Sequence, residues 1–144
     1  MDNPIEIKTV IKASAARIWK ALTDKTEMKA WYFDIQDFQP VEGNVFNFYE
    51  PGDHRKYHHN GEVLEVLTEK KISYTWTYPD FSTAKTTVVW EIEEKENNET
   101  SVKIIHSGTE KLSSLGDNFS RKSFAEGWSG ILNQSLKPFL EKKN

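Results

Sequence analysis

Residues 72–78 constrain the fold more than any other part of this sequence. Large apolar or aromatic side chains occupy every second position, and Ser73, Thr75 and Thr77 lie between them. Because successive side chains of a strand point to opposite faces, this pattern predicts a strand with one buried face and one polar face. Sheets with two unlike faces are typically antiparallel, and other elements must cover the apolar face.

Five more segments show strand patterns, and turn-forming residues separate them. In the first segment the alternation slips between Ile7 and Val10. Pro79 with Asp80 ends the strand at residues 72–78, and the polar residues 95–99 predict a hairpin loop. Pro51, Gly52 and Asp53 predict a further turn. The five segments are Ile5–Ile11, Val45–Tyr49, residues 61–67, residues 86–92, and a last strand with Val102, Ile104 and His106 facing inward.

Two short helices are expected between the first two strands. Ser14 suits the N-cap of the first helix, and Asp24 with Glu27 three residues later resembles a capping box at the start of the second. Apolar residues at helical spacing are Ile18, Trp19 and Leu22 in the first helix, and Met28, Ala30 and Trp31 in the second.

The end of the chain predicts one long amphipathic helix. Over residues 119–137 it would be about 28 Å long at 1.5 Å per residue. We expect Pro138 to kink or end it, because proline lacks an N–H group and its ring crowds the carbonyl group of residue 134. The residues at helical spacing are Phe124, Trp128, Ile131, Leu132, Ser135 and Phe139.

These elements predict an α+β fold, in which a curved antiparallel sheet wraps around the long C-terminal helix. The two short helices follow the first strand and close or line one end. With 144 residues, we expect a single domain over residues 1–144.

Composition excludes several classes of function. The formal net charge of −3 argues against nucleic-acid binding, which needs clustered positive charge. The sequence has no cysteine, which excludes disulfides, iron–sulfur clusters and thiol catalysis. No apolar run approaches the ~20 residues of a membrane helix, and the N-terminus does not resemble a signal peptide, so we expect a cytoplasmic protein. Gly127 and Ser129 do not have the spacing of a nucleophile elbow, and no nucleotide-binding fingerprint occurs.

The ordered set of segments resembles the START-like (SRPBCC, helix-grip) superfamily. Within it, the sequence is similar to the group named for the C-terminal domain of the activator of the heat-shock-protein-90 ATPase. The matching stretches are residues 18–24 with Trp31, residues 43–48, 61–65, 72–76, 88–92 and 100–108, and the pair Gly127 and Trp128.

The resemblance implies the helix-grip fold, with a cavity between helix and sheet that holds an apolar or aromatic small molecule. It also implies two alternatives. Some relatives are cyclases, hydrolases or lipid carriers, and the group name implies a stress-related regulator of a chaperone ATPase. The activator has an additional N-terminal domain, whereas this sequence begins with the predicted first strand, so we expect a small-molecule ligand before a chaperone partner.

The candidate ligand-binding residues are large rings, with one histidine, that are expected to face this cavity. Aromatic rings offer a large apolar contact area, and tyrosine adds a polar group. The alternative for each ring is ordinary core packing. The candidates are Trp31, Phe46, Phe48, Tyr74, Trp76, Tyr78, Trp90, His106, Phe124 and Trp128.

His106 has two interpretations. It could bond a ligand carbonyl group or act as a general base. Alternatively, it is a core histidine that bonds to a tyrosine or a backbone group. Glu65 lies in the predicted strand at residues 61–67, whose mixed sequence does not show which side chains face inward. We expect the Glu65 side chain to be exposed, with an internal carboxylate as the alternative. Gly127 and Gly130 flank Trp128 in the predicted helix, which indicates close approach of sheet side chains or of a ligand.

His54, His58 and His59 suggest a metal site, but the geometry argues against it. Adjacent residues of a strand point to opposite faces, so His58 and His59 cannot both bind one ion there. We therefore expect a solvated loop near the mouth of the cavity, with no metal and no cofactor.

Overall fold

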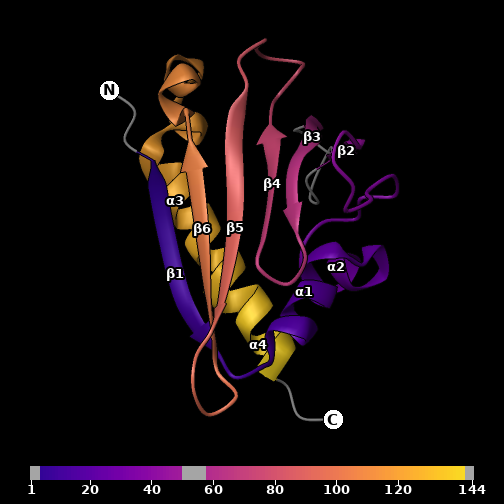
Figure 1. The fold of residues 1–144 in the computed structure, drawn as a ribbon. Coiled ribbons are helices and arrows are strands. Elements are labelled where there is room, and N and C mark those ends of the chain that lie inside the picture. Colours follow the sequence, from indigo (N-terminus) through magenta and orange to yellow (C-terminus); the bar gives the residue numbers. More distant parts are fainter. Residues whose placement is uncertain (1–3, 50–57, 142–144) are drawn as a thin grey trace.

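The computed structural model describes residues 4–49 and 58–141, and it contains one six-stranded antiparallel sheet (Figure 1). The strand order is β1-β6-β5-β4-β3-β2, so the first strand pairs with the last and β2 forms the other edge. The strands are β1 (Ile5–Ile11), β2 (Val45–Tyr49), β3 (His58–Leu67), β4 (Lys71–Trp76), β5 (Thr86–Glu94) and β6 (Thr100–Ser107).

A long C-terminal helix crosses one face of this sheet, and two short helices pack beside its far end (Figure 1). This arrangement confirms the predicted α+β helix-grip fold. No described helix is both long and apolar enough to span a membrane. The helical elements are α1 (Ala15–Thr23), α2 (Lys25–Trp31), the 3₁₀ turns η2 (Thr109–Lys111), η3 (Ser113–Leu115) and η4 (Asp117–Phe119), and then α3 (Arg121–Gly130), the π-helical η5 (Ile131–Leu136) and α4 (Lys137–Glu141).

The two predicted N-caps are confirmed. The Ser14 hydroxyl accepts the backbone N–H of Arg17 at 3.1 Å, and the Asp24 carboxylate accepts those of Thr26 and Glu27 at 2.9 and 3.2 Å. These bonds satisfy donors that the first turn of a helix leaves unpaired. The helices therefore begin where the sequence indicates.

The long helix differs from the prediction at both ends. It begins at Arg121 rather than Phe119, because the Ser120 hydroxyl caps it by accepting the N–H of Ser123 at 3.1 Å. It does not end at Pro138 but continues to Glu141. The wider turn of η5 comes directly before the proline, and such a turn is one way in which a helix adapts to a missing donor.

The π turn also keeps the helix facing the sheet. Its buried residues Phe124, Trp128, Leu132 and Leu136 recur every four positions. In a regular α-helix, each four-residue step would rotate the side chain by about 40° around the axis. The extra residue in the turn over residues 131–136 offsets this drift, and Leu132 and Leu136 are fully buried.

Three strands depart from the sequence pattern in detail. β1 alternates without a slip, and Val10 is 39% exposed. β4 ends at Trp76, so Tyr78 lies beyond the strand although it is buried. In β3 the register shifts between Val63 and Glu65, as in a β-bulge. The predicted turn at Pro51, Gly52 and Asp53, together with His54, lies outside the described residues.

Candidate functional site

All ten predicted site residues lie in the interior between the sheet and the helices. None is more than 8% exposed. Trp128 on α3 joins the two sides, because its ring lies 5.0 Å from that of Trp76 on β4 and 6.1 Å from that of Trp90 on β5. Trp31 on α2 meets the ring of Trp90 edge-on at 5.9 Å. The structure therefore brings these residues together, and their binding of a ligand stays a prediction.

Two further rings belong to this cluster. Phe33, just after α2, lies 4.8 Å from the ring of Phe48 and 6.2 Å from that of Trp76. His59 on β3 stacks on Phe48 at 4.7 Å and lies 4.6 Å from Trp76. The sequence could not have identified Phe33, because residues 32–44 show no periodicity. His59 could have been identified as inward-facing, because it alternates with Gly61 and Val63 along the strand.

The histidine pair departs from the expectation of a solvated loop. His58 and His59 belong to β3, and His59 is only 1% exposed. Its neighbour points to the other face, where its Nε2 lies 3.0 Å from the Asn47 amide oxygen. The predicted opposite facing is thus confirmed, but the inner histidine is enclosed by rings. Among the residues described, no three His, Cys, Asp or Glu side chains gather as a metal site would require.

His106 lies at the centre of a closed hydrogen-bond chain. The Trp128 indole Nε1–H donates to His106 Nδ1 at 2.9 Å. On the other side of the ring, Nε2 lies 2.8 Å from the Thr86 hydroxyl, which donates to the backbone carbonyl of Trp76 at 2.6 Å. Since the hydroxyl hydrogen is used there, Nε2 carries the proton and donates to Thr86, so the imidazole is neutral.

This environment decides between the two interpretations of His106. The side chain is fully buried, and burial lowers its pKa from 6.5 to about 3. Both ring nitrogens are occupied, so none is available to take a proton from a substrate. His106 is bonded as a core histidine would be, with Thr86 and Trp128 as partners rather than the expected tyrosine or backbone group.

A second chain lies beside the first. The Trp90 indole Nε1–H donates to the Tyr74 hydroxyl at 2.8 Å, and this hydroxyl lies 3.0 Å from that of Tyr32. Burial, with a smaller contribution from the neighbouring Tyr74, raises the pKa of Tyr32 well above its usual value. Burial is also the main reason why the pKa of Tyr74 rises to about 12. Both phenols are therefore neutral at physiological pH. Sequence reasoning missed Tyr32, which follows α2 and is half-buried.

The interior contains polar groups, but none of the described Asp, Glu, Lys or Arg side chains is buried there. The buried polar side chains in the described part of the chain are all Ser, Thr or His. The two remaining buried indoles also have acceptors, because Trp31 donates to the Ala21 carbonyl at 2.8 Å and Trp76 to the Tyr78 hydroxyl at 3.1 Å. Such an interior suits an uncharged molecule, since a buried ion without a partner is costly.

The two helical glycines do not mark a close approach. A Cβ atom at Gly127 would meet no atom within 4 Å, and one at Gly130 would meet only the side chain of Gln134, at 3.9 Å. Gly127 lies on the solvent side of α3. The expectation of close sheet packing at these glycines is therefore wrong. Glu65 is half-exposed on the outer face of the sheet and pairs with Lys71 at 2.9 Å.

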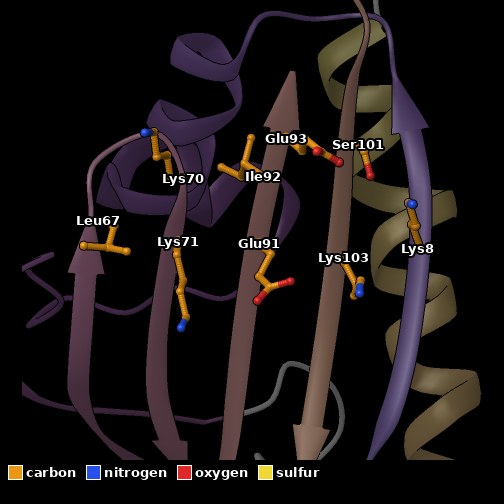
Figure 2. A pocket seen from close by; sticks show the side chains of 9 residues that line it. All are labelled: Lys8, Leu67, Lys70, Lys71, Glu91, Ile92, Glu93, Ser101 and Lys103. Atoms are coloured by element: carbon orange, nitrogen blue, oxygen red, sulfur yellow. The ribbon is translucent and has the colours of Figure 1, made fainter. Parts of the chain in front are cut away.

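The outer face of the sheet carries a shallow hollow of about 420 Å³, which the sequence analysis did not predict (Figure 2). Lys71 pairs in register with Glu91, and Glu91 with Lys103, so charges alternate across three strands. This charged surface is unlike the aromatic interior on the other face. The hollow is lined by Lys8, Leu67, Lys70, Lys71, Glu91, Ile92, Glu93, Ser101 and Lys103.

Comparisons with known proteins agree with this fold. The family model described as "Activator of Hsp90 ATPase homolog 1-like protein" matches residues 12–141. A search of curated proteins gave no match.

Several solved structures share the architecture. Protein MLL2253 from Mesorhizobium loti is 20% identical, with a TM-score of 0.78 and 99% of each chain covered. The Aha1 dimer from Colwellia psychrerythraea is 23% identical, with a TM-score of 0.74 and 97% of each chain covered. CalU16 from Micromonospora echinospora is 17% identical, with a TM-score of 0.73, covering 98% of this chain and 78% of its own. At these identities the likeness establishes the fold alone.

Proposed function

This chain belongs to the Activator of Hsp90 ATPase homolog 1-like family, and on that premise we propose that it binds an uncharged, apolar or aromatic small molecule. The ligand lies between the inner face of the sheet and the C-terminal helix. The alternative role of chaperone regulator would depend on an exposed protein-binding surface. We prefer the small-molecule ligand because the aromatic rings gather in the interior.

One observation carries the proposal: a continuous cluster of aromatic rings is shared by the sheet, the segment after α2 and the C-terminal helix. Trp76 lies at its centre, with Trp128 at 5.0 Å, Phe48 at 5.5 Å and Phe33 at 6.2 Å between ring centroids. Ring faces bind flat apolar molecules through large contact areas at little entropic cost. No described Asp, Glu, Lys or Arg side chain is buried, which favours a neutral ligand.

We propose that the ligand enters near the segment after α2, where two rings are half-buried. Tyr32 and Phe33 are partly exposed, and their rings are 4.6 Å apart. Phe33 also contacts Phe48 on β2. A ligand that stacks on Phe33 would reach Trp76 without crossing the sheet, so Tyr32 and Phe33, called the rim below, form the proposed route to the interior.

The proposal is tested by nuclear magnetic resonance of the indole N–H groups with 2-ethylnaphthalene as the probe. We expect the signals of Trp76, Trp90 and Trp128 to shift on titration. The signal of Trp19, which lies on α1, stays unchanged and serves as an internal control. Organic extraction and native mass spectrometry of the purified protein would then identify a natural ligand. No indole shift at the solubility limit of the probe would contradict the proposal.

A matched pair of variants locates the site. Phe33→Ala removes a ring of the proposed rim, and we expect it to weaken binding of the probe about tenfold, because a buried aromatic side chain contributes over 1 kcal/mol. Phe81→Ala removes a ring that is 45% exposed and contacts Phe119 instead. This control is expected to bind the probe as the wild type does. Equal losses in both variants would place the ligand elsewhere.

A further inference from the structure

We infer that the Tyr32 hydroxyl is the polar anchor of the ligand and donates a hydrogen bond to a carbonyl oxygen of the bound molecule. This inference rests on the proposed function, because it names the chemistry that the same interior site would recognise. It adds a requirement on the ligand that an apolar site alone would not impose. The ligand must have one neutral acceptor, and this acceptor must lie at Tyr32 beside the aromatic cluster.

The hydrogen-bond chain formed by Trp90, Tyr74 and Tyr32 has one more hydrogen than it uses. An indole N–H only donates, and each phenol has one hydrogen to donate. The Trp90 hydrogen goes to the Tyr74 oxygen at 2.8 Å, and the 3.0 Å contact between the two hydroxyls uses one phenol hydrogen. One phenol hydrogen is left over. Within the described ranges, no other hydrogen-bond partner is found for either hydroxyl.

Burial decides which phenol keeps the unused hydrogen. Tyr74 is 3% exposed, and a buried hydroxyl hydrogen without an acceptor costs more than a hydrogen bond gains. Tyr32 is the less buried of the two residues, so an unused hydrogen costs less there. Tyr74 therefore donates to Tyr32, and the chain runs from Trp90 through Tyr74 to a free donor at Tyr32.

The surroundings of Tyr32 define what this donor can meet. Its ring stacks on Trp31 at 4.8 Å and lies 4.6 Å from Phe33, and it meets the ring of Trp90 edge-on at 5.9 Å. A ligand oxygen at this hydroxyl therefore places the rest of the ligand against aromatic faces. Burial raises the pKa of both phenols, so they bind as neutral donors. No Lys or Arg side chain is buried in the described part of the chain to compensate a carboxylate, which favours a neutral carbonyl group.

The test uses two probes of nearly the same shape, 2-acetylnaphthalene and 2-ethylnaphthalene, of which only the first has a carbonyl oxygen. Tyr32→Phe removes the hydroxyl and keeps the ring. We expect this variant to weaken binding of the ketone about five- to tenfold, the value of one neutral hydrogen bond, and to leave binding of the hydrocarbon unchanged. Tyr49→Phe, at a residue that is 43% exposed on β2, is the control and is expected to change neither affinity.

A spectroscopic signature separates this role from a structural one. When a ligand accepts from Tyr32, the whole chain is polarised, because linked hydrogen bonds strengthen one another. We expect the ketone to move the Trp90 indole N–H signal further than the hydrocarbon does in the wild-type protein. In Tyr32→Phe the two probes should produce the same shift.

The outcomes distinguish failure of the inference from failure of the proposed function. If both probes bind and Tyr32→Phe leaves the ketone affinity unchanged, or weakens both probes equally, the anchor is wrong and the binding function stands. If neither probe binds the wild-type protein, the proposed function is wrong and the anchor falls with it. Selective loss of the ketone supports both.

Discussion

Two hydrogen-bond chains lie side by side in this interior, and they differ in how they end. Each begins at an indole N–H group, that of Trp128 or Trp90, and each passes through a residue of the inner sheet face. The chain through His106 ends on the backbone carbonyl of Trp76, so every hydrogen has an acceptor. The chain through Tyr74 ends at a half-buried phenol with one hydrogen left over.

The difference shows how a polar group in an aromatic core can be assigned a role. His106 is the residue whose chemistry suggests catalysis, yet its chain is closed, and a closed chain contributes to stability and specificity of packing. Tyr32 has no sequence signal, yet its chain is open and faces the rim. The balance of donors and acceptors, rather than the residue type, separates the structural group from the candidate binding group.

The largest expected effect comes from opening the closed chain. His106→Leu removes the acceptor of the Trp128 indole N–H and leaves that donor buried. We expect the free energy of unfolding, measured by urea denaturation, to fall by about 3 kcal/mol. The matched control is His58→Leu, because His58 lies on the outer face of the sheet. The free energy of unfolding of this variant should stay within about 1 kcal/mol of the wild type. Equal effects would mean that the closed chain has no special value.

The next effect is a dependence of stability on pH that originates at His106. Its pKa is about 3 in the folded protein against 6.5 for the ordinary group, so the unfolded chain binds the proton first. The stabilisation is complete above about pH 6.5 and is lost progressively as the pH falls towards 3. From pH 7 to pH 5, the free energy of unfolding should fall by about 2 kcal/mol from this group alone.

This effect has a direct check. The ring proton signals of His106 should show no titration between pH 8 and pH 4, because its pKa of about 3 lies below this range. A His106 signal that titrates near pH 6.5 would show that the imidazole takes up a proton inside the core. The closed chain would then not hold it neutral.

The alternation of apolar and polar residues predicted the inner face of the sheet well. Tyr74, Trp90 and His106 were identified because successive side chains of a strand point to opposite faces, and this alternation can be seen within each segment by itself. The strand pairing was not readable in this way. Thr86 and Trp128 are 20 and 22 residues from His106 in sequence, and only the register and the crossing of the helix bring them to its two nitrogens.

The rest of the candidate site was hidden from the sequence for other physical reasons. Tyr32 caps the end of α2 with φ −123° and ψ −113°, a conformation outside both helix and strand, so no repeat identifies its facing. The continuation of the helix through Pro138 depends on the π turn over residues 131–136, which apolar spacing does not distinguish from a regular helix. Gly127 suggested a close approach but lies at the solvent side.

A smaller effect is expected when the open chain is cut in its middle. Tyr74→Phe removes the acceptor of the Trp90 indole N–H and the donor to Tyr32. We expect a loss of about 1.5 kcal/mol in the free energy of unfolding, because one buried N–H is left without a partner. Urea denaturation measures this loss, with Tyr49→Phe as the control that should stay within about 0.5 kcal/mol. A loss as large as that of His106→Leu would make the two chains equivalent.

The smallest effect is expected at the open end, and it tests the comparison most directly. Tyr32→Phe removes a hydroxyl whose own hydrogen is unused, so it breaks one neutral hydrogen bond at a half-buried residue. The loss in the free energy of unfolding should be about 0.5 kcal/mol. The double variant Tyr32→Phe with Tyr74→Phe should cost no more than Tyr74→Phe alone, since the bond between the hydroxyls is then already absent. If Tyr32→Phe instead costs as much as Tyr74→Phe, the Tyr32 hydroxyl is as firmly bonded as His106. Both chains would then be structural, and the interior would offer a ligand no donor.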